Sequence, residues 1–479
     1  MQNSTRLLTL FILLVVGTTF RLPAQDRALN SVEIELQRLI QDPGLKHGQV
    51  GFVATNLDNG RVIVEHHNYR ALIPASIQKV VTTATVLKQH GPSYQFHTTL
   101  AHSGSITAGT LQGDLYIIAD GDPTLNSRYF SGDEHFQKIK AALEEAGIKK
   151  IEGRLVLDLS IYDEHTTPDA WSWEDMGNYF GATPTGLMWN DNMIEVHLRS
   201  GQVGTDVVLA QPWPEYRPFS LEIDIQAAQG DKDDAWFFSA PKSDMIYGKG
   251  TIPAHKQDFV VKISNPDPVL TFGQDLVREL KLGEPEIYIS HSDLDVETKT
   301  LLDIYSAPLE TIAKVTNHQS VNLYAEALNI LNDTHTHQKS VEGGVYAAMA
   351  QLKQWKVNTS GVRMLDGSGI SPMNRMTPQT MVELLGAIYR DDVYPAFYNS
   401  LPIGGESGTV KWYFQSGKAK GNLRAKSGTM SGVRNYAGYV KNKYDENVAF
   451  CIMLSDYDES RRAEIMKKVE RLIEAVIED

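Results

Sequence analysis

The spacing of apolar residues separates the chain into helical stretches at its ends and in its middle, with a region of short strands between them. Apolar residues three or four positions apart predict helices, whereas short apolar runs bounded by turn residues predict strands. The predicted helices cover 31–40, 76–90, 134–146, 272–280, 308–331, 378–390 and 465–477. The predicted strands include 50–57, 61–66, 98–101, 113–118, 154–158, 423–426, 435–441 and 447–454.

The strands near the two ends of the chain predict one antiparallel sheet. Asp58-Asn59-Gly60 separates the first two strands and is a strong hairpin turn, because these residues tolerate positive φ. The strands at 435–441 and 447–454 form a second hairpin, and the strand at 423–426 would lie beside it. We expect the terminal helices to cover one face of this sheet and the helical middle to cover the other. The predicted fold class is α/β of the α+β type.

Short strands and glycine turns replace the helical pattern between residues 96 and 262. We interpret 96–262 as an inserted β-rich region made of two nested subdomains. Residues 26–95 and 263–479 would then form the main domain on either side of the insertion.

The composition is that of a globular protein, with 42% apolar and 22% charged residues among 479. The net charge of −14 argues against a nucleic-acid-binding surface. Residues 1–25 have the charged start, apolar run and small-residue end of a signal peptide, which predicts export to the periplasm. No later run is long enough to span a bilayer. The single cysteine, Cys451, lies in an apolar strand and is expected to be a buried structural thiol.

The stretch from Pro74 to Val81 carries the first candidate chemistry. Ser76 and Lys79 are three residues apart, so on a helix the amine reaches the hydroxyl. A desolvated lysine can act as the base that makes a serine nucleophilic. The plain alternative is that Ser76 caps the helix and Lys79 is a solvated charge. Ser239 and Lys242 repeat the spacing, but the proline between them and the lack of helical periodicity mark that pair as a decoy.

Two further motifs stand behind this helix in sequence order. Ser320-Val321-Asn322 lies within the predicted helix 308–331, and Lys426-Ser427-Gly428-Thr429 ends a predicted strand. Taken singly, the first is a polar pair on a helix surface and the second is a strand leading into a turn. Together with Ser76-x-x-Lys79, they form the motif set of β-lactamases and penicillin-binding proteins.

On these motifs the chain resembles a class C low-molecular-mass penicillin-binding protein of the D-alanyl-D-alanine carboxypeptidase/endopeptidase family. The resemblance covers nearly all of the chain after the leader and extends to the blocks 113–125, 171–180 and 366–375. The long gap between Lys79 and Ser320 also matches the inserted domains of that family. The resemblance implies a penicillin-recognising serine transpeptidase-like fold, peptidoglycan stem peptides and β-lactams as ligands, and no metal or cofactor.

The resemblance also implies roles for the motif residues. Ser76 would be the acylated nucleophile and Lys79 its general base. Ser320 would relay the proton to the leaving D-alanine, and Asn322 would hold the substrate amide. Lys426 would supply positive potential that keeps Lys79 neutral and attracts the terminal carboxylate. Val321, at a position where relatives often carry an acidic residue, leaves these working groups intact.

Recognition of the substrate would fall to two other groups of residues. Ser427, Gly428 and Thr429 would bind the terminal carboxylate through the two hydroxyls, and the backbone N–H groups of Thr429 and of the nucleophile would form the oxyanion hole. Threonine is common in relatives where this chain has Ser427. In the inserted region, Asp175 would pair with the ammonium of a diamino acid in the stem peptide and Phe180 would pack on its carbon chain. The alternative for Asp175 is a helix cap.

Two rival functions stay open. A β-lactamase would need a dedicated base for fast deacylation, and no glutamate motif for that role is identified. A catalytically silent peptidoglycan-binding module could keep the fold, although it would have no need of the intact motifs. His335 and His337 have metal-like spacing but no further ligand motif, so an exposed turn is expected there. The oligomeric state and any loose membrane association do not follow from the sequence.

Overall fold

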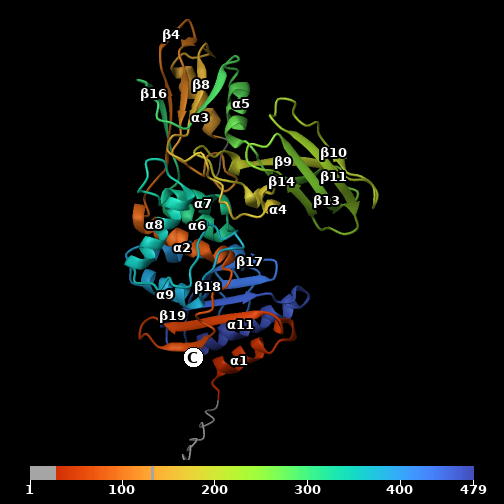
Figure 1. Ribbon diagram of the computed structural model, residues 1–479, viewed down its shortest axis with the longest axis vertical. Helices are drawn as coiled ribbons and strands as arrows, with labels where there is room; N and C mark the ends of the chain where they lie inside the picture. Colours follow the sequence, from red (N-terminus) through yellow and green to blue (C-terminus); the bar gives the residue numbers. More distant parts are fainter. Residues whose placement is uncertain (1–28, 131–133) are drawn as a thin grey trace, which may run out of the picture.

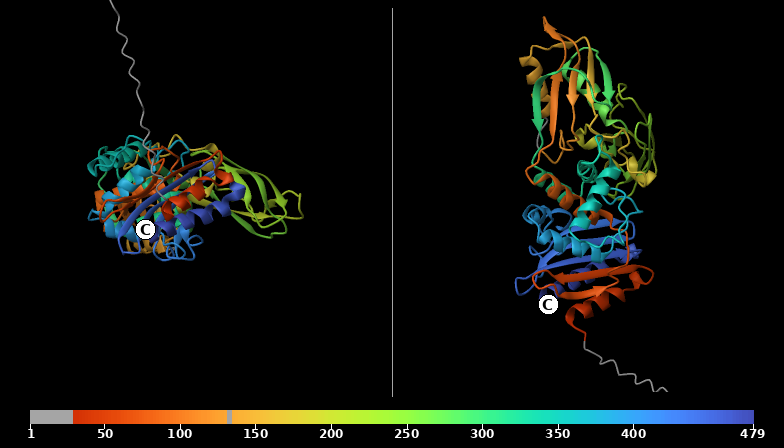
Figure 2. Two further views of the ribbon diagram at one scale, coloured as in Figure 1. Left: turned by 90° about the horizontal axis from the view of Figure 1, so that it is seen from below. Right: turned by 60° about the vertical axis from the view of Figure 1, so that its left-hand side comes forward.

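The computed structural model describes residues 29–130 and 134–479. The chain forms three bodies: two are stacked along the long axis of the molecule, and the third lies to one side (Figure 1). The terminal body contains residues 29–96 and 306–479. The upper body contains 97–130, 134–158 and 268–305, and the nested body contains 193–264. The views in Figure 2 show the same arrangement, with the nested body projecting to one side. The predicted signal peptide, 1–25, lies outside the described residues.

A five-stranded antiparallel sheet forms the base of the terminal body, in the order β17-β18-β19-β1-β2. Both predicted hairpins are present in it. The strands are β1 Gln49–Asn56, β2 Val62–His66, β17 Arg424–Met430, β18 Val433–Lys441 and β19 Asn447–Ser455. Nearly every residue of β19, including Cys451, is buried, because helices cover both faces of the sheet.

The two faces of this sheet pack against different helices. The terminal helices, α1 Ser31–Ile40 and α11 Arg462–Glu478, cover one face and share a core with Phe52 and Phe450. A helical layer covers the other face and separates the sheet from the insert (Figure 1). Its helices are α2 Lys79–His90, α6 Leu309–Gln319, α7 Asn322–Leu331, α8 Val341–Gln354, α9 Pro378–Tyr389 and α10 Tyr394–Ser400.

The helix predicted for 308–331 is in fact two helices. Ser320 adopts a left-handed conformation, with φ 58° and ψ 38°, and ends α6. Val321 is extended, and α7 begins at Asn322. The apolar spacing continues across the break, so periodicity alone did not reveal it. The Ser320-Val321-Asn322 motif therefore lies at the connection between two helices and not within one.

The upper body has a five-stranded mixed sheet in the order β15-β8-β6-β3-β16 and a small three-stranded sheet, β4-β5-β7. Its elements are β3 His97–His102, β4 Ser105–Thr107, β5 Thr110–Gln112, β6 Leu115–Ile118, α3 Glu134–Glu145, β7 Lys150–Ile151, β8 Arg154–Asp158, α5 Pro268–Leu280, β15 Glu286–Ser290 and β16 Lys299–Tyr305. The last three come after the nested body in sequence, and β16 pairs with β3.

This pairing corrects the predicted end of the insertion. The chain returns to the upper body through α5, β15 and β16, so residues 263–305 do not belong to the main domain. The apolar side of α5 faces the core of the upper body, with Phe272 and Leu276 buried there. Helical periodicity shows that a face is apolar, but it does not show which core that face joins.

The nested body consists of two three-stranded sheets, β10-β9-β14 and β11-β13-β12, around a shared apolar core. Its strands are β9 Met193–Arg199, β10 Val208–Leu209, β11 Ser220–Ala228, β12 Asp234–Phe238, β13 Met245–Pro253 and β14 Phe259–Ser264. The short helices α4 Trp173–Met176 and η3 Tyr179–Gly181 precede it and lie between it and the helical layer. Among the helices of the described residues, none has the length and apolar character that crossing a bilayer requires.

Candidate active site

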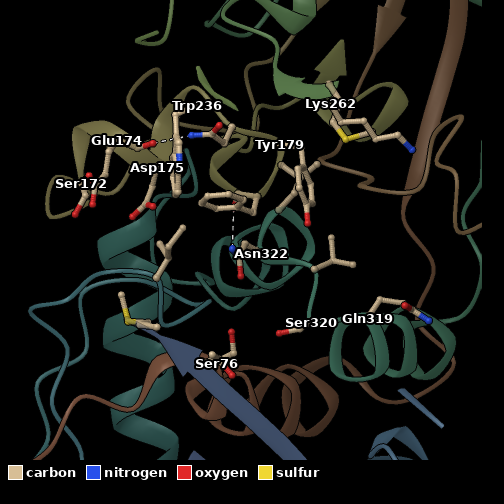
Figure 3. Close-up of a pocket in the computed structure, with 18 of the residues that line it drawn as sticks. Ser76, Ser172, Glu174, Asp175, Tyr179, Trp236, Lys262, Gln319, Ser320 and Asn322 are labelled. Atoms are coloured by element: carbon tan, nitrogen blue, oxygen red, sulfur yellow. Dashed lines mark hydrogen bonds between the residues drawn. The ribbon is translucent and has the colours of Figure 1, made fainter. Parts of the chain in front are cut away.

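A cleft of about 1300 Å³ opens where the helical layer, the nested body and strand β17 meet. The predicted site residues that line it are Ser76, Asp175, Phe180, Ser320, Asn322 and Thr429. In Figure 3, Ser76 and Ser320 lie at the bottom of the cleft, Asn322 lies above them, and Asp175 lies on the left. Residues far apart in sequence are thus brought to one cleft.

Ser76 and Lys79 lie together as the sequence predicted. Ser76 belongs to the 3-10 turn η2 Ala75–Gln78, which leads directly into α2. The Lys79 amine is 3.0 Å from the Ser76 hydroxyl. Burial lowers the pKa of Lys79 to about 7, although the carboxyl groups of Glu326 and Asp366 oppose this shift. A large fraction of this amine is therefore neutral near pH 7.

The hydrogen bonds of Lys79 fit a neutral amine. The Nζ atom is 2.7 Å from Asn322 Oδ1 and 2.7 Å from the Ser368 carbonyl oxygen, in addition to its contact with Ser76. The first two partners can only accept a hydrogen bond. A neutral amine has two hydrogens for these acceptors and one lone pair, which can accept from the Ser76 hydroxyl. The arrangement can therefore take a proton from Ser76.

The loop at 365–371 forms a buried platform under Lys79. Its backbone N–H groups at Gly367 and Ser368 donate to the Glu326 carboxyl group, each at 2.8 Å. Burial, and then the nearby Asp366, raises the pKa of Glu326 to about 8. Residues 366–375 were one of the blocks that resemble the family, but neither Glu326 nor Asp366 was predicted to contribute to the site. The only signal was an acidic residue within an apolar helical run.

Lys426 and Ser320 contact each other beside the cleft. Lys426 is buried on β17, and its Nζ lies 2.9 Å from Ser320 Oγ and 2.7 Å from the Ser427 carbonyl oxygen. Burial, with the charges of Lys79 and Arg434, holds the pKa of Lys426 well below its usual range. Ser320 ends α6 in a left-handed conformation, and its side chain lines the cleft at the connection to α7.

Gly428 allows strand β17 to approach the turn that carries Ser76. A Cβ atom at Gly428 would lie 2.7 Å from the Pro74 carbonyl oxygen and 3.1 Å from the Ser76 nitrogen. The first distance is shorter than real Cβ contacts and the second is tighter than most, so any residue other than glycine would push the two backbones apart. The close approach brings the backbone of Ser76 beside the edge of β17 that carries Thr429.

Two residues that the sequence analysis missed hold the hydroxyl groups of β17. Ser427 Oγ lies 2.7 Å from Thr409 Oγ1. Arg434 donates from Nη1 to Thr429 Oγ1 at 2.6 Å, and β18 places it directly opposite Thr429. Arg434 is buried, and no carboxylate of the described residues lies within ion-pair distance of it. The predicted strands ended too early at 426 and began too late at 435 to show this pairing.

Asp175 and Phe180 form part of the wall on the side of the nested body. Asp175 lies in the first turn of α4 and is half-buried, and its carboxylate accepts no hydrogen bond from the described residues, so it is not a cap. Burial, and then the neighbouring Glu174, raises the pKa of Asp175 to about 6. The Phe180 ring packs edge-on against Trp236, and its carbonyl accepts a hydrogen bond from Asn322 Nδ2 at 2.7 Å, drawn dashed in Figure 3.

Other residues weighed from the sequence lie away from the cleft. Ser239 and Lys242 lie in a turn before β13, where Lys242 pairs with Glu164 at 2.5 Å. His335 and His337 lie in an exposed turn, as predicted, with His337 3.2 Å from Asp293. None of these residues contributes to the cleft.

Three motifs meet at this cleft: the Ser76 and Lys79 pair, Ser320-Val321-Asn322 between two helices, and Lys426-Ser427-Gly428 on β17. Together they are typical of one class of serine enzymes, the β-lactamases and penicillin-binding proteins. The chain belongs to the D-Ala-D-Ala carboxypeptidase 3 (S13) family, whose model matches residues 32–476. The resemblance named from the sequence is therefore confirmed. The chain is a serine-type D-Ala-D-Ala carboxypeptidase. It is a hydrolase and belongs to the penicillin-binding proteins.

Individual relatives agree with this family. D-alanyl-D-alanine carboxypeptidase DacB of Haemophilus influenzae is 25% identical over 418 residues, which cover 85% of this chain and 85% of the relative. A D-alanyl-D-alanine carboxypeptidase of Actinomadura sp. is 26% identical over 456 residues, which cover 90% of this chain and 82% of the relative.

A solved structure confirms the fold class. Penicillin binding protein 4 of H. influenzae superposes with a TM-score of 0.81 at 24% identity, covering 94% of this chain and 100% of that one. The same relative has been solved with a β-lactam, where the TM-score is 0.76 at 23% identity. The fold with inserted domains is thus shared with that protein.

Proposed function

We propose that the protein cleaves peptidoglycan stem peptides after a D-alanine through an acyl-Ser76 intermediate. It would act as a carboxypeptidase on terminal D-alanine and as an endopeptidase on cross-linked peptides. The observation that carries the proposal is the 3.0 Å contact between Ser76 Oγ and a buried Lys79 whose pKa is about 7. A nucleophile and its base must lie within this distance for proton transfer.

The acylation step follows from the positions of the polar groups. Lys79 takes the proton of Ser76 as the oxygen attacks the carbonyl carbon of the D-alanine residue. The backbone N–H groups of Ser76 and Thr429 donate hydrogen bonds to the carbonyl oxygen as negative charge develops on it. Each donor stabilises the transition state by about 3 kcal/mol. The proton taken from Ser76 passes through the Ser320 hydroxyl, which Lys426 holds by a hydrogen bond, to the leaving amine as the peptide bond breaks, so Lys79 is neutral again. Water then hydrolyses the ester and releases Ser76.

The terminal carboxylate of the substrate binds beside β17. Arg434 is a buried cation beside Thr429, Lys426 is a buried amine beside Ser427, and no described carboxylate pairs with either. A substrate carboxylate would compensate this charge and accept hydrogen bonds from the two hydroxyls. The site would bind β-lactams in the same way, because they carry a carboxylate beside a reactive carbonyl, and the acyl-enzyme would account for inhibition.

The wall at Asp175 would recognise the diamino acid of the stem peptide. Its carboxylate has no partner among the described residues, which leaves it available to a substrate ammonium. Phe180 would pack on the carbon chain of the same side chain. Asn322 would hold the substrate amide with the N–H that does not donate to Phe180. Export by the predicted leader would place this activity in the periplasm, where peptidoglycan is found.

Labelling with a penicillin tests the proposal. The mature protein and a Ser76→Ala variant are incubated with a labelled penicillin, and the modified peptide is identified by mass spectrometry. We expect one stable adduct on Ser76, absent from the variant, and release of D-alanine from peptides ending in D-Ala-D-Ala. Rapid hydrolysis of the drug without a stable adduct would favour a β-lactamase. Neither an adduct nor hydrolysis would favour a silent binding module.

A further inference from the structure

We propose that residues 171–180 of the insert, here named the recognition segment, position Lys79 for acylation through hydrogen bonds from both ends of the segment. The inference rests on the proposed roles of Ser76 and Lys79. It makes the insert part of the machinery that orients the base, in addition to any contact it makes with a stem peptide.

The first connection starts at the end of the segment, at Phe180. Its carbonyl oxygen can only accept, so the amide nitrogen of Asn322 is the group that faces it, at 2.7 Å. This fixes the orientation of the amide and turns Oδ1 of Asn322 toward Lys79, also at 2.7 Å. Without the Phe180 carbonyl, the amide could rotate and present its nitrogen to Lys79. The base would then lose an acceptor.

The second connection starts at the beginning of the segment, at Trp171. Its buried indole N–H donates to Asp366 Oδ2 at 3.0 Å. Asp366 is itself buried and holds the loop, because Gly369 N donates to its other oxygen at 2.8 Å. Between these two residues, the Ser368 carbonyl oxygen accepts from Lys79 at 2.7 Å. The indole therefore helps to fix the second acceptor of the base.

The nested body holds the segment between these two connections. The side chain of Asn178 accepts from Phe237 N of β12 at 3.2 Å and donates to the Phe237 carbonyl at 3.3 Å. Ser264 N of β14 donates to the Gly177 carbonyl at 3.1 Å. A Cβ atom on Gly181 would lie 2.0 Å from the Asp175 carbonyl oxygen, so the segment is tightly folded on itself. A displacement of the nested body would thus move both groups that accept hydrogen bonds from Lys79, Asn322 Oδ1 and the Ser368 carbonyl oxygen.

A ligand that bears no stem-peptide side chain separates positioning of the base from recognition of a side chain. Trp171→Phe removes the indole N–H and keeps an aromatic ring. Trp173→Phe is the matched control, because Trp173 lies in the same segment but is exposed and packs toward Phe238. We expect Trp171→Phe to slow acylation of Ser76 by benzylpenicillin about tenfold, because small misplacements of a catalytic group have large effects on rate. Trp173→Phe should acylate at the wild-type rate.

The final stoichiometry and the pH profile of acylation distinguish positioning from misfolding. Trp171→Phe should still reach one adduct per chain, and the rise of its rate with pH should move to lower pH, because a lost acceptor disfavours the ammonium form of Lys79 more than the neutral amine. A variant that is only partly folded gives fewer adducts and leaves the pH profile in place. The charged groups that face Lys79 are Glu326, Asp366 and Lys426.

Gly181→Ala tests the other connection, since the added Cβ clashes with the Asp175 carbonyl and must move the backbone that carries the Phe180 carbonyl. We expect the same slower acylation and the same shift of the profile. Wild-type acylation rates in both Trp171→Phe and Gly181→Ala, with full stoichiometry, would overturn the inference while leaving the acyl-Ser76 proposal intact. Loss of the Ser76 adduct from the wild-type protein would instead overturn the proposed function itself.

Discussion

The floor of the cleft and its wall differ in how their polar groups are used. On the floor, Lys79 and Lys426 are hydrogen-bonded to Ser76 and Ser320. On the wall, the carboxylate of Asp175 is half-buried without a hydrogen bond from any described residue. A preorganised floor suits chemistry, because no reorganisation is needed as charge develops. An unpaired wall suits recognition, because the ligand supplies the missing partner.

The largest effect should come from the floor, with Lys79→Met. Removing the base should lower the rate of Ser76 acylation about 1000-fold, within the range of general-base contributions. Stopped-flow mixing with a fluorescent penicillin measures this rate. Lys88→Met on the same helix is the matched control, because Lys88 pairs with Asp392 at the surface. Acylation of Lys79→Met at a rate close to wild type would exclude Lys79 as the base.

The next effect should come from Arg434→Gln at the edge of the floor. The guanidinium donates to Thr429 Oγ1, so the hydroxyl hydrogen of Thr429 is free to bind a carboxylate. Hydrogen bonds to charged groups contribute about 1.5–3 kcal/mol, which predicts a loss of about 10- to 100-fold in kcat/KM. The loss should appear with a thioester substrate that carries a carboxylate and not with its methyl ester.

The control for this substitution is Arg424→Gln. Arg424 lies on the same strand as Thr429 but stacks on Tyr398. It should leave the preference for the carboxylate unchanged. An equal loss for the acid and the ester in Arg434→Gln would show that Arg434 only supports the fold.

Much of the floor could be predicted from sequence, because its residues belong to short motifs at fixed spacing. Ser76 and Lys79 share one turn, so their contact follows from helix geometry. The break at Ser320 was missed, since the left-handed residue does not interrupt the apolar spacing. Arg434 and Thr409 act through contacts made across strands and loops, which no local pattern records.

The wall was less predictable for a topological reason. Asp175 and Phe180 were found only through resemblance to a family. The end of the insert was misplaced, because the chain returns to a sheet it left earlier and β16 pairs with β3. Pairing between strands about 200 residues apart leaves no trace in local periodicity.

A smaller effect is expected on the wall, from Asp175→Asn. An ion pair at a half-exposed site contributes about 1 kcal/mol, so kcat/KM for a peptide with a diamino acid should fall about fivefold. The matched peptide with alanine at that position should be cleaved at an unchanged rate, as measured by D-alanine release. Acylation by benzylpenicillin should also be unchanged. Equal losses for both peptides would mean that Asp175 does not contact the side chain.

The smallest effect is a difference in the shape of two pH profiles. Acylation needs neutral Lys79, so kcat/KM for any substrate should rise as the pH rises through about 7. Binding of an ammonium needs ionised Asp175, whose pKa is raised to about 6, so this contribution is present above pH 6 and lost as the pH falls below it. The ratio of kcat/KM for the diamino peptide to that for the alanine peptide should therefore fall below pH 6. Taking the ratio cancels the titration of Lys79, which both peptides share. In Asp175→Asn the ratio should stay constant between pH 5 and pH 8. If it is also constant in the wild type, Asp175 does not contribute to substrate specificity, and the floor of the cleft must account for all of it.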